Sequence, residues 1–84
     1  MSLDSLRAAQ RKTIGSKETR RALERAEAKK VFIAQDADEH IIRPVLDLSK
    51  QKSVDVAYVD SMVQLGKACG ISVGAAAAAI LESE

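Results

Sequence analysis

Aromatic residues, cysteine and histidine are all scarce in this 84-residue chain. Phe32 and Tyr58 are its only aromatics, so the stacked aromatic platforms of single-strand-binding proteins are disfavoured. Cys69 is the only cysteine, which excludes an internal disulfide and a cysteine metal cluster and fits a reducing, cytoplasmic location. His40 has no second histidine and no adjacent nucleophile, so we expect no catalytic centre, no metal and no cofactor.

Long apolar runs are also missing from the sequence. No stretch reaches the length of a membrane span and no signal-peptide pattern opens the chain, so no membrane partner is expected. Hydrophobic residues make up 46% of the chain and charged residues 30%, which is typical of a globular protein. With this length we expect a single domain that covers residues 1–84.

Charge is unevenly distributed, although the net charge is only +1. Residues 1–30 carry +5 and residues 31–84 carry −4. A clustered positive field attracts polyanions even on a near-neutral protein, and the alternative is an ordinary solvated helix face. The cations nearest Gly15 are Arg11, Lys12, Lys17, Arg20, Arg21 and Arg25.

Residues 15–21 have the pattern of a turn that enters a helix. Gly15 permits backbone conformations closed to other residues, and Ser16 is a favourable N-cap because its hydroxyl accepts a free amide of the first turn. Free amides and basic side chains at a helix start can bind phosphate. A capped surface helix has the same pattern, so this segment alone does not decide between a phosphate site and ordinary structure.

Hydrophobic periodicity predicts alternating helices and strands. Helices are expected at residues 3–10, 17–26, 44–52 and 62–69, and strands at residues 12–14, 30–34 and 54–59. The buried side chains of the second and third helices should be Thr19, Ala22, Leu23, Ala26, Val45, Leu46, Leu48 and Ser49.

Helix ends are predicted from capping residues and from proline. Pro44 should lie in the first turn of the third helix, after a looser segment at residues 40–43. Asp60 and Ser61 should cap the fourth helix, and Gly70 should end it. Cys69 should be a small core residue.

Two stretches are open to two interpretations. Residues 36–39 hold three carboxylates, for which we prefer a helix N-terminus to a metal site because acids favour the positive end of a helix. Residues 75–79 are five alanines, which propensity predicts as helix. A buried strand of small side chains would instead complete the sheet, and periodicity does not separate the two in so short a run.

Three blocks of the sequence, in order, resemble one family. They are Gly-Ser-Lys-Glu-Thr-Arg-Arg at residues 15–21, Val-Phe-Ile-Ala-Gln-Asp-Ala-Asp at residues 31–38, and Leu-Gly-Lys-Ala-Cys-Gly-Ile-Ser-Val-Gly-Ala-Ala-Ala at residues 65–77. The chain resembles small bacterial members of the ribosomal L7Ae family of kink-turn RNA-binding proteins. A kink-turn is a bulged RNA duplex that bends sharply beside tandem sheared G·A pairs.

The resemblance implies an α/β fold, a three-layer α/β/α sandwich with a four-stranded mixed sheet, in which the alanine run is a strand. It also implies a non-enzymatic binder of structured RNA, with the ribosome as a candidate assembly. We expect a monomer, because a fold this small commonly stands alone. The turn and helix start would lie against the G·A pairs, and the loop before the last strand would pack on the bulge. The residues implied in RNA contact are Gly15, Ser16, Lys17, Glu18, Arg21, Asp38, Ile71, Ser72, Val73 and Gly74.

The chemistry of these side chains agrees with RNA readout. An ionised Glu18 only accepts hydrogen bonds, so it would meet base amino or imino groups, whereas Arg21 can donate two bonds to guanine. Ile71 and Val73 need no polar partner and can pack on unstacked bases. The cations suited to phosphates, which position the RNA without specifying its sequence, are Lys17, Arg11 and Lys12.

Three positions depart from the family pattern. Lys17 stands where many members have asparagine, Ser16 replaces threonine, and Met62 stands where some members carry a basic residue. Together with the low net charge, the change at residue 17 motivates an alternative function. In that alternative the chain is a protein-interaction module of a ribonucleoprotein assembly that has lost RNA readout.

Overall fold

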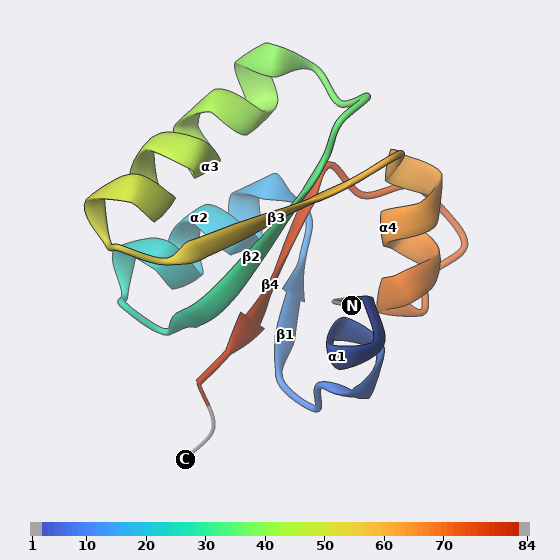
Figure 1. Cartoon of the computed structure of the whole chain (residues 1–84), viewed down its shortest axis with the longest axis horizontal. Helices are drawn as coiled ribbons and strands as arrows, with labels where there is room; N and C mark the ends of the chain where they lie inside the picture. The colour runs from blue at the N-terminus through green and yellow to red at the C-terminus, as the bar shows by residue number, and fades with distance from the viewer. Residues whose placement is uncertain (1–2, 83–84) are drawn as a thin grey trace.

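The computed structural model describes residues 3–82, in which helices and strands alternate along the chain (Figure 1). The elements are α1 Leu3–Ala8, β1 Lys12–Ile14, α2 Ser16–Glu24, β2 Ala28–Ala34, α3 Glu39–Gln51, β3 Asp55–Val59, α4 Met62–Cys69 and β4 Ala77–Leu81. The strands form one sheet in the order β1-β4-β2-β3. Strands β2 and β3 are parallel and β4 runs antiparallel to both its neighbours, so the predicted mixed sheet is confirmed.

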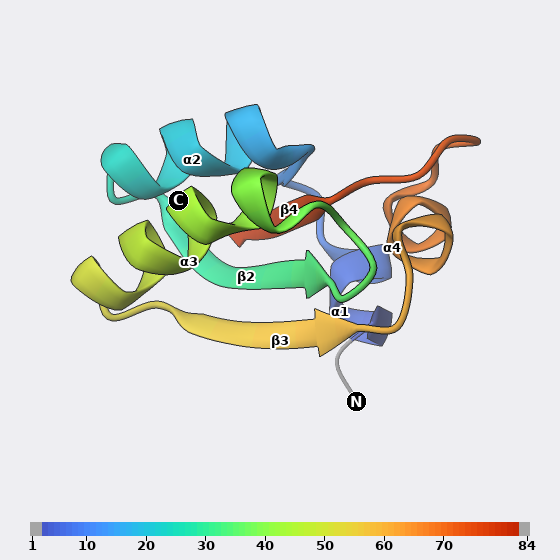
Figure 2. The ribbon, with the colours of Figure 1, turned by 90° about the horizontal axis from the view of Figure 1, so that it is seen from above.

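Helices cover both faces of the sheet, as the predicted three-layer sandwich requires. Figure 2 shows α2 and α3 together on one side, and α1 packs with α4 on the other. From Val31 to Ala34, strand β2 is apolar on both faces because it separates the two cores. Phe32 and Ala34 pack beneath α1 and α4, whereas Val31 and Ile33 pack beneath α2 and α3.

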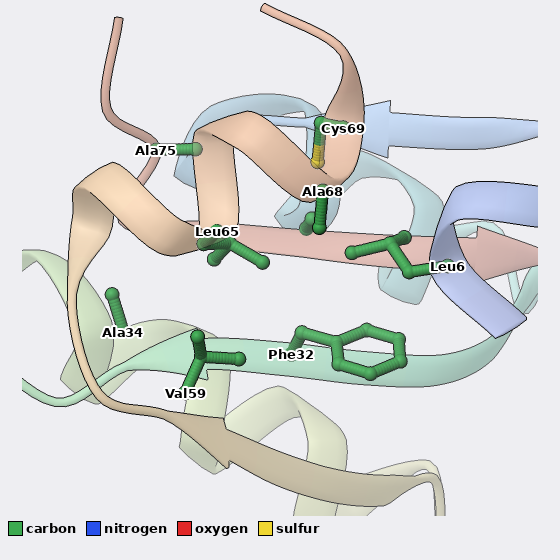
Figure 3. Packing of buried hydrophobic residues seen from close by; sticks show 9 residues of the cluster. Leu6, Phe32, Ala34, Val59, Leu65, Ala68, Cys69 and Ala75 are labelled. Atoms are coloured by element: carbon green, nitrogen blue, oxygen red, sulfur yellow. The ribbon is translucent and has the colours of Figure 1, made fainter. Parts of the chain in front are cut away.

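The first of these cores is small and closely filled. Leu6 of α1 and Leu65 of α4 point toward Phe32 and Val59 of the sheet, and all four side chains are buried (Figure 3). Cys69 lies in the same cluster, so its predicted place in the core is confirmed. Burial raises the pKa of the Cys69 thiol, and the nearby Lys12 ammonium opposes that rise in part.

The alanine run is a strand in the structure, which confirms the prediction from the family resemblance. Ala77, Ala78 and Ala79 of β4 are fully buried between β1 and β2. Sheet pairing on both edges and burial on both faces outweigh the intrinsic helix propensity of alanine here. The small side chains also let the helices of both layers approach the centre of the sheet closely.

The expected ends of α2 were wrong at both positions. The N-cap is Gly15, with no side-chain cap bond, and Ser16 is already the first helical residue. At the other end the helix stops at Glu24, and Ala26 is exposed with a φ of 57° rather than buried. The chain must turn at residue 26 to enter β2, and this reversal overrides the apolar spacing.

The expected start of α3 was also wrong. The helix begins at Glu39, and the Asp38 carboxylate caps it by accepting a 2.8 Å hydrogen bond from the His40 amide. Residues 40–43 are therefore helical, and Pro44 lies inside the helix rather than in its first turn. The cap at Asp38 and an apolar face that contacts α2 and β3 hold the helix across this proline.

The buried side of α3 is narrower than expected, because Val45 and Ser49 are buried while Leu46 and Leu48 are half-buried.

The ends of α4 match the prediction. Ser61 caps it by accepting from the Gln64 amide at 3.1 Å, and Gly70 ends it with a φ of 85°.

Candidate nucleic-acid interface

The sheet brings together two segments that lie far apart in the sequence. Strands β1, β2 and β3 end at the same edge of the sheet, where β4 begins. There the Gly15 amide donates to the Ala77 carbonyl at 2.8 Å, and the Ala34 amide donates to the Ala76 carbonyl at 2.9 Å. The turn that starts α2 therefore lies beside the loop of residues 71–76, and we call this edge the carboxyl edge.

The turn itself depends on glycine. Gly15 has a φ of 102° and a ψ of 156°, a conformation that residues with a Cβ rarely adopt. Its carbonyl accepts from the Thr19 amide at 3.1 Å, while the hydroxyls of Thr13 and Thr19 share a 2.9 Å hydrogen bond. The first amides of α2 that follow Gly15 have no partner within the helix, as at any helix start.

The charged side chains of the turn project into solvent. Lys17 and Glu18 are exposed, and an Arg21 guanidinium nitrogen lies 3.4 Å from a Glu18 carboxylate oxygen. Both side chains of this ion pair remain about half exposed, and such surface pairs contribute roughly 0–1 kcal/mol. A ligand that offers both a donor and an acceptor can therefore replace the contact between Glu18 and Arg21 at a small cost in free energy.

The 71–76 loop approaches α4 closely at two glycines and is held there by two main-chain hydrogen bonds. A Cβ on Gly66 would stand 2.0 Å from the Val73 carbonyl oxygen, and one on Gly74 would stand 3.0 Å from the Met62 Cβ. The Ile71 amide donates to the Gly66 carbonyl and the Ala75 amide to the Met62 carbonyl, each at 3.0 Å. The loop is therefore a fixed part of the carboxyl edge.

The two predicted apolar contacts of this loop differ in exposure. Val73 is 68% exposed, whereas Ile71 is half-buried and packs against the core beneath α4. Ser72 and Gly74 are exposed on either side of Val73. Val73 is thus the larger apolar surface that the loop offers to a ligand.

The acidic segment after β2 supplies caps to two helices. Asp38 caps α3 and stays largely exposed at the carboxyl edge. Asp36 reaches across to α4, where its carboxylate accepts from the Met62 amide at 2.8 Å. Within residues 3–82 no cluster of metal-ligating side chains is present. The predicted helix N-terminus is confirmed by the Asp38 cap, but no local pattern indicates that Asp36 caps a helix 26 residues further on.

Two predicted RNA-contacting cations lie away from this edge. Arg11 and Lys12 stand at the opposite end of β1, where the Arg11 guanidinium donates to the Glu82 carbonyl at 2.8 Å. The Lys12 ammonium donates to the Leu6 carbonyl of α1 at 3.2 Å. The structure thus gathers the other predicted residues and leaves this pair apart, and contact of the pair with RNA stays a prediction.

One glycine and one acid at this edge support the site without being among its predicted contacts. Gly66 and Asp36 were not singled out as site residues, although both lie inside the blocks that resemble the family. The Leu-Gly-x-Ala spacing was the available signal for Gly66, since glycine inside a helix marks a close approach. Among residues 3–82, none of the helices has the length and apolar character of a membrane span.

The fold and this edge define a small α/β/α sandwich protein, with exposed charged and apolar groups where β1, β2 and β3 end. The chain belongs to the ribosomal protein L7Ae/L30e/S12e/Gadd45 family, whose model matches residues 2–84.

Named relatives and a solved structure are similar over nearly the whole chain. A Bacillus pumilus protein named "RNA-binding protein" is 49% identical over 81 residues, which cover 96% of this chain and 99% of that one. "RNA-binding protein YbxF" of Geobacillus stearothermophilus has the same identity and coverage. The solved "Giardia lamblia 15.5kD RNA binding protein" matches with a TM-score of 0.85 at 28% identity, covering 98% of this chain and 69% of that chain.

Proposed function

We propose that this protein is a non-enzymatic RNA-binding protein that recognises kink-turns and stabilises their bent form by binding it preferentially. The observation that carries the proposal is the convergence of residues 15–21 and the 71–76 loop at the carboxyl edge. These two segments carry the family's motif, and the fold joins them through the Gly15–Ala77 hydrogen bond.

Four exposed side chains of the edge have a stated role in this proposal. Glu18 accepts hydrogen bonds from base amino or imino groups, and Arg21 donates to guanine O6 and N7. Lys17 neutralises a phosphate, while Val73 covers unstacked bases at the bulge. The Glu18–Arg21 ion pair keeps the two side chains side by side until RNA replaces their mutual contact.

The binding unit in this proposal is one copy of the chain, because the turn and the loop both come from the same protomer. The family description includes ribosomal proteins, which supports ribosomal or ribosome-associated RNA as the target. A cytoplasmic location is part of the proposal.

The test is a titration of the protein against two short RNA duplexes at physiological salt. One duplex carries a three-nucleotide bulge beside tandem G·A pairs, and in the other Watson–Crick pairs replace the G·A pairs. We expect strong preference for the first. Equal, weak and salt-sensitive binding to both would refute kink-turn readout and favour a role in protein contacts within a ribonucleoprotein.

Single substitutions in α2 then locate the readout. Glu18→Ala and Arg21→Ala should each weaken kink-turn binding by about 1–3 kcal/mol, because each removes a base contact. Arg25→Ala is the matched control, since Arg25 caps the far end of the same helix and is also exposed. The control should weaken binding to both RNAs slightly and equally. Unchanged affinity in both Glu18→Ala and Arg21→Ala would show that these residues are not part of the site.

A further inference from the structure

The main chain of Met62 links the acidic segment after β2 to the 71–76 loop. Its amide donates to the Asp36 carboxylate at 2.8 Å, and its carbonyl accepts from the Ala75 amide at 3.0 Å. Met62 is the first residue of α4, so its amide has no partner inside the helix. Asp36 is therefore the side chain that fixes the residue to which the loop is attached.

Close contacts with α4 leave the 71–76 loop little room to adopt another conformation. Gly74 packs against the Met62 side chain and carbonyl, where an added Cβ would stand 3.0–3.3 Å from Met62 atoms. The Val73 carbonyl lies close against Gly66, one turn further along α4. A shift of the first turn of α4 would therefore carry the exposed Val73 with it.

We propose that Asp36 is a positioning residue for RNA binding, which acts through the Met62 main chain to hold the 71–76 loop in its binding conformation. This inference rests on the proposed function. A loop that is already ordered loses less conformational entropy on binding, so a fixed loop binds more tightly than a loose one. Asp36 is suited to this role because its negative charge also lies at the positive end of the α4 dipole.

The experiment compares Asp36→Ala with Ser61→Ala, which is its matched control. Ser61 caps the same helix through the Gln64 amide, so both variants lose one cap of α4 but only Asp36→Ala frees the Met62 amide. Amide hydrogen exchange measures loop opening at Ala75 in the protein without RNA. Titration against the bulged G·A duplex and its Watson–Crick counterpart, well below the unfolding temperature, measures affinity and selectivity.

We expect exchange at Ala75 to rise about five- to tenfold in Asp36→Ala, because only this variant frees the amide of the residue that holds Ala75, and less than twofold in Ser61→Ala. Affinity for the kink-turn RNA should fall about three- to tenfold in Asp36→Ala, with a smaller loss for the Watson–Crick duplex. Asp36→Asn should restore most of both, because its amide oxygen still accepts from Met62.

Unchanged exchange at Ala75 in Asp36→Ala would overturn the proposal. Faster exchange with unchanged kink-turn affinity would also overturn it, because order in the loop would then not affect binding. Equal affinity losses in the two variants would overturn it too, because they would reflect general destabilisation of α4. If the unmodified protein shows no preference for the kink-turn duplex, the proposed function fails at that point. The exchange comparison still measures the Asp36–Met62 link in that case.

Discussion

Gly66→Ala tests the close contact between α4 and the 71–76 loop. The added Cβ would stand 2.0 Å from the Val73 carbonyl oxygen, a separation that real side chains do not adopt. Either the loop or the helix must move by about 1 Å to relieve this contact, and both partners are main chain with little room to yield. Displacing Val73 in this way would also alter the apolar surface offered to RNA.

The expected loss of stability follows from two opposed terms. Overpacking of this kind costs about 1–3 kcal/mol, and contact with the main chain places it near the upper end. Alanine gains about 0.5–1 kcal/mol over glycine inside a helix, which leaves a net loss of about 2 kcal/mol. For a domain of this size that corresponds to a fall of roughly 8–16 °C in Tm.

Urea unfolding and thermal unfolding of Gly66→Ala measure this loss directly. Lys67→Ala is the matched control, because Lys67 is the next residue of α4 and is exposed, and it should change stability by less than about 0.5 kcal/mol. A Gly66→Ala variant as stable as the unmodified protein, or more stable, would refute the reasoning, because the added Cβ would then cost no more than the gain in helix propensity.

Three further predictions concern single residues. Pro44→Ala should raise the free energy of unfolding by about 1–2 kcal/mol, because an amide at residue 44 can donate to the His40 carbonyl, and a loss of stability in urea would contradict this. Gly15→Ala should destabilise the fold by about 1–2 kcal/mol in the same assay through its φ of 102°, with no steric clash, so a neutral effect would show that the turn relaxes. The pKa of Cys69 is raised in the folded state, so its contribution to stability should be full below the ordinary value of 9.0 and disappear as pH rises through the folded pKa. Cys69→Ala should abolish that part of the pH dependence, and an unchanged profile would assign it to other groups.

The sequence predicted most where local patterns and the final structure agree. The Ser61 cap, the Gly70 end of α4 and the two-sided core strand around Phe32 all follow from residues within a few positions of one another. Errors came where distant contacts decide local geometry. Gly15 rather than Ser16 is the N-cap of α2, in a turn whose amide is held by Ala77 on another strand.

The sequence allowed us to predict which exposed residues lie together, but not the contacts that hold them in place. The resemblance named groups of the turn and the loop that the structure brings to one edge, and their contact with RNA stays a prediction, whereas Asp36 bonds to α4 across 26 residues. Arg11 and Lys12 were grouped with the turn because they are near it in sequence, yet β1 carries them to its other end. Sequence proximity overestimates spatial proximity across a strand, since each residue of a strand advances about 3.3 Å.

The position of β4 sets the order in which this protein can become functional during its synthesis. Among the described residues, β1 pairs with β4 and with no other strand. Residues 12–14 therefore join the sheet only after residues 78–80 have been synthesised. The Gly15 turn likewise gains its hydrogen bond only once Ala77 is present. A ribosome must therefore translate nearly all of the described residues before the carboxyl edge exists, and a nascent chain that ends before β4 would carry the turn and the loop without the strand that joins them.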